Sequence, residues 1–132
     1  FNKYYNNDDR ISKNWDKIIQ GNQRFLDKHE NTLNSSQKAH KYYQTGKAYL
    51  NKNNINKANS CFSKSTKLTG EMKHYILISI CLGKKGEMRL ARKFIKKSIS
   101  RFGLDYKLVF IYFLTYTSKK AFKTINRIPN YI

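Results

Sequence analysis

Large apolar side chains recur at intervals of three and four residues along most of the chain, which is typical of amphipathic helices. No stretch alternates between apolar and polar positions as a strand does, so the pattern predicts an all-α fold of antiparallel hairpins. We expect residues 1–10 to be an irregular lead-in and Ser12 to cap the first helix. The expected helices span residues 12–29, 37–50, 55–68, 71–82, 87–102 and 105–119, and a weaker helical tail follows up to Pro129.

A spaced set of small and aromatic residues occurs in the second and third expected helices. Tyr42, Gly46 and Tyr49 are followed by Ala58 and Phe62, a spacing that resembles the tetratricopeptide repeat, a helix–turn–helix unit. Gly46 and Ala58 would let two helices approach closely, and Tyr49 and Phe62 would fill the space between them. We therefore expect a short solenoid of stacked hairpins with capping helices, although an ordinary helical bundle would also place such residues in its core.

A weaker second copy follows in the fourth and fifth expected helices. Ala91 takes the place of Ala58 and Ile95 that of Phe62, while Ser79 stands where the first copy has Gly46. The sequence alone leaves open whether this copy packs as a true repeat.

A longer series of short motifs resembles a known family. The segment Arg10-Ile11-Ser12 is followed by Lys17, Gly21, the run Phe25-Leu26-Asp27-Lys28-His29, Leu33, and then Tyr42-Tyr43, Gly46-Lys47 and Tyr49-Leu50. Over about residues 8–100, this order is similar to the region that follows the catalytic domain of bacterial and archaeal family 2 glycosyltransferases. The chain begins with Phe rather than Met, so we expect it to be a piece of a longer protein.

The resemblance implies four regions and a parent enzyme. Residues 1–10 would lead in from an upstream catalytic domain, 11–30 would be a linking helix, 37–102 the tetratricopeptide-like repeats, and 104–132 a capping helix and tail. The parent would use a nucleotide-sugar donor and a divalent metal. The metal-binding Asp-x-Asp motif of that family is absent, because Asp8-Asp9 is followed by Arg10, and no catalytic residue is carried over to this chain.

The net charge of the chain indicates what kind of partner it binds. Lys and Arg number 27 against 8 Asp and Glu, so the formal net charge is +19. Such an excess favours an anionic partner, and a cluster on or just before the fifth expected helix could contact it: Lys85, Arg89, Arg92, Lys93, Lys96 and Lys97. The alternatives are a codon bias toward Lys, Asn, Ile and Tyr, and a simple solvated face. Because the aromatic residues are expected on inner faces, nucleic acid is the less favoured partner.

Candidate catalytic chemistry is sparse. His29, His40 and His74 are scattered, Cys61 and Cys81 are too far apart for a Cys-x-x-Cys motif, and no Gly-rich phosphate loop is present. Both thiols are expected to be buried and unreactive. The longest apolar run, residues 108–117, is too short to span a membrane and is expected to be a buried terminal helix.

The sequence therefore predicts a non-catalytic module without a cofactor of its own. We expect a cytoplasmic location, at the membrane periphery if the basic helix docks there. A stand-alone tetratricopeptide-like module that binds a peptide is the main alternative, and a basic nucleic-acid-binding protein is the third.

Overall fold

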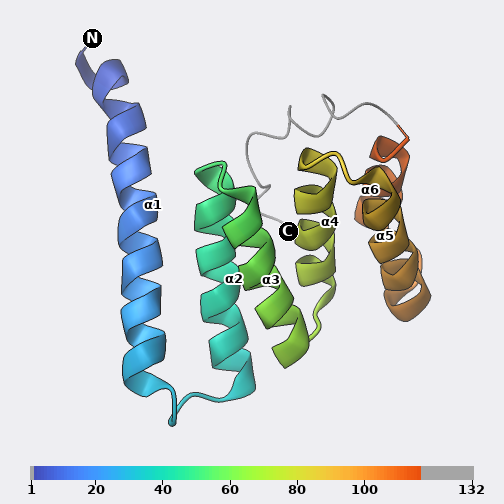
Figure 1. The fold of residues 1–132 in the computed structure, drawn as a ribbon, viewed down its shortest axis with the longest axis horizontal. Coiled ribbons are helices and arrows are strands. Elements are labelled where there is room, and N and C mark those ends of the chain that lie inside the picture. The colour runs from blue at the N-terminus through green and yellow to red at the C-terminus, as the bar shows by residue number, and fades with distance from the viewer. Residues whose placement is uncertain (1, 117–132) are drawn as a thin grey trace.

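A computed structural model describes the backbone of residues 2–116 and the side chains of residues 14–116. This part of the chain contains six helices and no strand: α1 (Asn2–His29), α2 (Ser35–Asn51), α3 (Ile55–Leu68), α4 (Met72–Lys84), α5 (Met88–Phe102) and α6 (Tyr106–Leu114). Figure 1 shows α1 to α5 side by side in chain order, each antiparallel to the one before it, with α6 behind α5. Every helix packs against the next, and α6 also reaches α4. The predicted all-α stack of hairpins is confirmed.

The first helix begins earlier than predicted. Residues 2–10 are helical rather than irregular, and α1 continues without a break through Ser12, which is therefore not at a helix start. The Asn and Asp residues of this segment lower helix propensity only modestly, and neither Gly nor Pro occurs before Gly21. The expected boundary between a lead-in and a linking helix at residue 10 was therefore wrong. The last residues of the sixth expected helix, 117–119, and the tail expected after them lie outside the described residues.

The turn between α2 and α3 and the turn between α4 and α5 have the same geometry. Asn53 and Gly86 both adopt the left-handed conformation, with φ of 63° and 84°. The N–H of the following residue reaches back across the turn in each case: Asn54 donates to the Tyr49 carbonyl at 2.8 Å, and Glu87 donates to the Leu82 carbonyl at 2.9 Å. The two hairpins thus share the same turn geometry.

Because the two turns share one geometry but differ in residue type, substitutions at Gly86 and Asn53 should change the stability of the chain differently. Gly86→Ala should lower the free energy of unfolding by about 1 kcal/mol, because a side chain is disfavoured at positive φ. Asn53→Gly should be neutral or slightly stabilising, because glycine adopts that conformation without steric cost. Urea unfolding monitored by circular dichroism would compare them. Equal effects of both substitutions would contradict the assignment of the same turn to both hairpins.

The hydrophobic core lies between neighbouring helices of the stack. Ala58, Phe62, Ala91 and Ile95 are each 0% exposed, as predicted for the repeat scaffold. Gly46 is buried against Phe62: a Cβ atom built on Gly46 would lie 2.6 Å from Phe62 Cε1. The predicted close approach of α2 and α3 is therefore present.

Two predicted scaffold residues are less buried than the others. Tyr42 and Tyr49 are only half-buried, and the buried ring of α2 is that of Tyr43, whose centroid lies 6.1 Å from that of Phe62. Between the two helices Ser65 also contributes, since its hydroxyl donates to the Ala39 carbonyl at 3.0 Å. Tyr42 and Tyr49 both line a surface pocket, and Tyr49 also packs against the buried core as predicted.

Candidate functional site

Helix α5 separates an apolar face from a basic face. Ala91, Ile95 and Ser98 are buried against the stack. On the outer side lie four exposed cations that we call the basic face: Arg89, Lys93, Lys96 and Lys97. None of the ion pairs formed within residues 14–116 involves them. Like charges three and four residues apart weaken a helix slightly, so this arrangement costs stability unless an anion neutralises it.

The two other cations of the predicted cluster have partners within the fold. Lys85 Nζ lies 4.0 Å from the Glu87 carboxylate. Arg92 is half-buried: its guanidinium donates to the Thr115 carbonyl at 3.2 Å and lies 4.7 Å from the centroid of the Tyr116 ring. Arg92 therefore links the first turns of α5 to the end of α6. An external anion could contact its guanidinium in addition.

Helix α6 departs from the prediction that the aromatic residues face inward. Leu108 and Ile111 are buried, but Tyr106, Phe110 and Phe113 are 73%, 62% and 66% exposed. As the last described helix, α6 packs on α4 and α5 with one side only, while its sequence is apolar on nearly every side. The sequence indicated this only through the lack of polar residues between 108 and 114, because an amphipathic helix would have had a polar face there.

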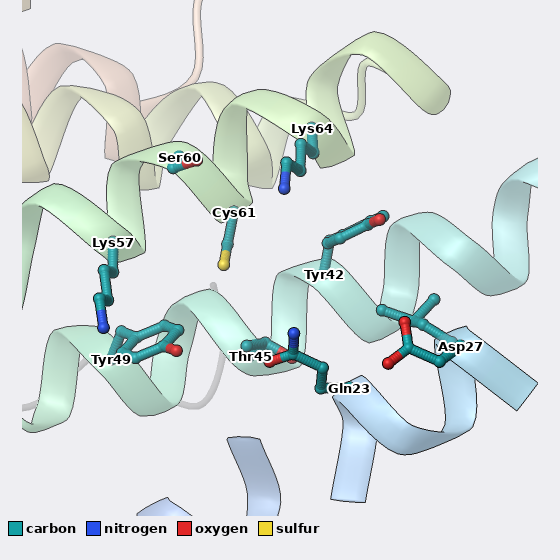
Figure 2. A pocket seen from close by; sticks show the side chains of 10 residues that line it. Gln23, Asp27, Tyr42, Thr45, Tyr49, Lys57, Ser60, Cys61 and Lys64 are labelled. Carbon is teal, nitrogen blue, oxygen red and sulfur yellow. The ribbon is translucent and has the colours of Figure 1, made fainter. Parts of the chain in front are cut away.

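A pocket of about 390 Å³ opens between α1 and α3, with α2 as its floor. Figure 2 shows Lys57, Cys61 and Lys64 reaching from α3 toward Tyr49 and Tyr42 of α2, with Gln23 and Asp27 of α1 on the other side. Lys57 Nζ lies 5.6 Å from the centroid of the Tyr49 ring, and Lys64 Nζ lies 5.3 Å from that of Tyr42. The lining thus combines aromatic surface with charges of both signs, which sequence reasoning did not foresee.

The thiols show no sign of activation. Cys81 is fully buried, and burial raises its pKa to about 12. Cys61 is half-buried, and burial likewise raises its pKa, despite the nearby Lys64 ammonium. Both stay protonated and poorly nucleophilic at neutral pH. Among the described side chains, no group of three or more His, Cys, Asp or Glu residues could hold a metal ion.

In the described part of the chain, no helix is both long and apolar enough to cross a bilayer. Comparisons with family models, with curated proteins and with solved structures found no match. The basic face of α5, the exposed side of α6 and the pocket are the features of the described chain that bear on its function.

Proposed function

We propose that this chain is a non-catalytic helical-repeat module that docks on an anionic membrane surface through the basic face of α5. The observation that carries the proposal is the set of four exposed cations on one side of a helix whose other side is buried in the stack. Each Lys or Arg held near an anionic bilayer contributes about 1 kcal/mol. A rigid helix would present all four at once, without the entropy cost of ordering a flexible tail.

The side chains of the basic face suit a surface whose negative charge is spread over many groups. Three of the four cations are lysines, which act as compact point charges rather than as planar forks that grip one phosphate through two bonds. A bilayer that contains anionic lipids offers many equivalent phosphates and needs no such geometry. The attraction should fall with added salt, because exposed charges are screened over about 8 Å at physiological ionic strength.

We further propose that the module belongs to a family 2 glycosyltransferase. The support is the order of short motifs between residues 8 and 100, which is similar to the segment that follows the catalytic domain of those enzymes. The resemblance implies a lipid-linked or surface glycan as the acceptor, and a membrane-docking module would suit an enzyme with such an acceptor. Genomic sequence in frame upstream of the Phe1 codon tests this origin: an α/β domain with an Asp-x-Asp motif would support it, and an unrelated domain would remove it.

A second candidate function is the binding of a peptide from a partner protein. The observation that favours it is the pocket between α1 and α3, since its Tyr42 and Tyr49 rings could pack against an apolar side chain of a peptide. Lys57 and Lys64 would then pair with acidic residues beside that side chain. Substitution of Lys57 and Lys64 by Gln would weaken such a complex and leave membrane docking unchanged.

Charge removal from α5 tests the docking proposal. The variant Arg89→Gln/Lys93→Gln/Lys96→Gln/Lys97→Gln should bind vesicles of phosphatidylcholine and phosphatidylglycerol at least about tenfold more weakly than the wild-type chain. Cosedimentation at low and high salt would measure this.

The matched control loses the same charge elsewhere. Lys17→Gln/Arg24→Gln/Lys28→Gln/Lys67→Gln removes four exposed cations from α1 and α3. We expect it to keep most of the binding. An equal loss in both variants, or equal binding of the wild-type chain to neutral and anionic vesicles, would contradict docking through α5.

A further inference from the structure

The most exposed apolar side chains of the described chain are concentrated at its C-terminal end, between positions 104 and 116. Leu104 is 83% exposed, and the exposed fractions of Tyr106, Phe110, Phe113 and Tyr116 lie between 62% and 73%. Elsewhere in the described part, the exposed large apolar side chains reach only 38% to 45%. A cluster of this kind commonly marks an interaction site.

Three of these side chains share one side of α6, and Leu104 and Tyr116 flank the helix at its two ends. Tyr106, Phe110 and Phe113 are spaced by four and three residues, which places them on one face of the helix. The opposite side carries Leu108 and Ile111, which already fill the contact with α4 and α5. The exposed side is therefore not needed for the packing of α6 in the stack. We call Tyr106, Phe110, Phe113 and Tyr116, together with Leu104, the aromatic face.

We infer that the aromatic face enters the interfacial region of an anionic lipid bilayer while the basic face of α5 contacts the headgroups. Phe, Tyr and Leu beside Lys and Arg form the combination by which helices lie in that region. With nine residues, α6 is about 14 Å long, so it would lie along the surface rather than span the bilayer. This inference rests on the proposed docking function and adds an apolar contribution to it.

Arg92 of α5 contacts one end of the aromatic face. Its guanidinium lies 4.7 Å from the centroid of the Tyr116 ring, which places a cation at the edge of the aromatic face. Tyr116 also shares a hydrogen bond of 2.9 Å with the hydroxyl of Tyr112, so polar groups border the apolar surface at this end. The interfacial region of a bilayer likewise brings polar groups next to hydrocarbon.

Single-stranded nucleic acid is the competing occupant, because bases also stack on exposed rings beside cations. The composition of the face favours lipid. Leu104, its most exposed member, provides apolar area but no ring for stacking, and Phe110 and Phe113 provide no polar atom to contact a base edge. Lipid insertion uses the area of all of these side chains.

Tryptophan fluorescence tests the inference directly. Trp15 of α1 is the chain's single Trp, so Phe110→Trp in a Trp15→Phe background reports from the aromatic face alone. With phosphatidylcholine–phosphatidylglycerol vesicles, we expect its emission to shift to shorter wavelength and to be quenched by brominated acyl chains. In the wild-type chain Trp15 serves as the control, and its emission should change little. Phe113→Trp in the same background provides a second reporter.

A pair of substitutions separates the apolar contribution from the charge contribution. Phe110→Ser/Phe113→Ser should weaken binding to the same vesicles by about tenfold, and the loss should persist at high salt. Ile18→Ser, which removes an exposed apolar side chain from α1, should leave binding unchanged.

The outcomes distinguish the inference from the function on which it rests. Salt-sensitive binding of the wild-type chain to anionic vesicles, with no shift or quenching of either reporter, would overturn insertion and leave docking through α5 in place. No binding to vesicles at all would overturn both. Quenching of the reporters by a single-stranded oligonucleotide, without any response to vesicles, would replace lipid with nucleic acid.

Discussion

Replacing Gly46 by leucine is expected to lower the free energy of unfolding by about 3 kcal/mol, at the upper end of the usual cost of overpacking. A Cβ atom at this position would lie 2.6 Å from Cε1 and 2.9 Å from Cδ1 of Phe62. The Phe62 ring is 0% exposed and packs beside Tyr43, so it has no free space into which it could turn. Helices α2 and α3 would have to separate, which would open the core between them. Guanidinium unfolding monitored by circular dichroism would measure the change.

Gly21 offers the matched control. It also lies within a helix, but a Cβ atom there would meet nothing within 4 Å. Gly21→Ala should therefore stabilise the chain by about 0.5–1 kcal/mol through helix propensity alone. An unchanged unfolding midpoint for Gly46→Leu would contradict the close approach of the two helices.

A double-mutant cycle would identify Phe62 as the cause. Gly46→Ala should cost less in a Phe62→Leu background than in the wild-type chain, because leucine lacks the ring atoms closest to the new Cβ. Additive effects would mean that the strain arises elsewhere.

Local spacing was sufficient to predict the hairpins. Gly46 and Phe62 belong to different helices, yet the pattern around them indicated that they meet, because small and large residues at helical intervals specify which faces can approach. The turns followed from Asn53 and Gly86, whose types tolerate the left-handed conformation. The second copy, with Ser79 in place of glycine, was uncertain from sequence and proved to share the turn geometry of the first.

The features that were not predicted from the sequence depend on which helices pack against one another. The lack of polar residues in 108–114 indicates an apolar helix but not which of its sides is covered, since that depends on the place of α6 at the end of the described stack. The bond from Arg92 to Thr115 joins residues that are distant in the sequence and follows from the packing of α5 against α6. Likewise the pocket exists only because α1 and α3 lie on either side of α2. The basic face was predictable because a helix exposes one side wherever its other side is buried.

Acidification is expected to destabilise the fold through a single buried imidazole. His74 of α4 is 1% exposed, and its ring centroid lies 5.4 Å from that of Tyr43. Burial lowers the pKa of His74 to about 4; the nearby Glu71 carboxylate opposes this shift, and the Lys73 ammonium adds to it. The Nδ1 atom has no hydrogen-bond partner within the described residues, so no acceptor there would stabilise a proton on that nitrogen.

The direction of the pH dependence follows from which state of the chain, folded or unfolded, binds a proton at His74 more tightly. In the unfolded chain the imidazole has an ordinary pKa near 6.5, so between about pH 6.5 and 4 the unfolded state binds more protons than the folded one. The contribution of His74 to stability is thus complete above about pH 6.5, falls as the pH drops, and is constant again below about pH 4. A shift of this size corresponds to about 3 kcal/mol. Urea unfolding at a series of pH values would measure the decline.

Two substitutions separate His74 from the other groups that titrate in this range. His74→Phe keeps an aromatic ring against Tyr43 but cannot be protonated, so its stability should change much less between about pH 6.5 and 4.5 than that of the wild-type chain. His40→Gln removes an exposed imidazole and should retain the full decline. Equal declines in both variants would assign the acid sensitivity to the carboxylates instead. If the decline in stability is specific to His74, acid weakens the contact between α2 and α4 first. The protonated ring would have to move away from Tyr43 to reach water.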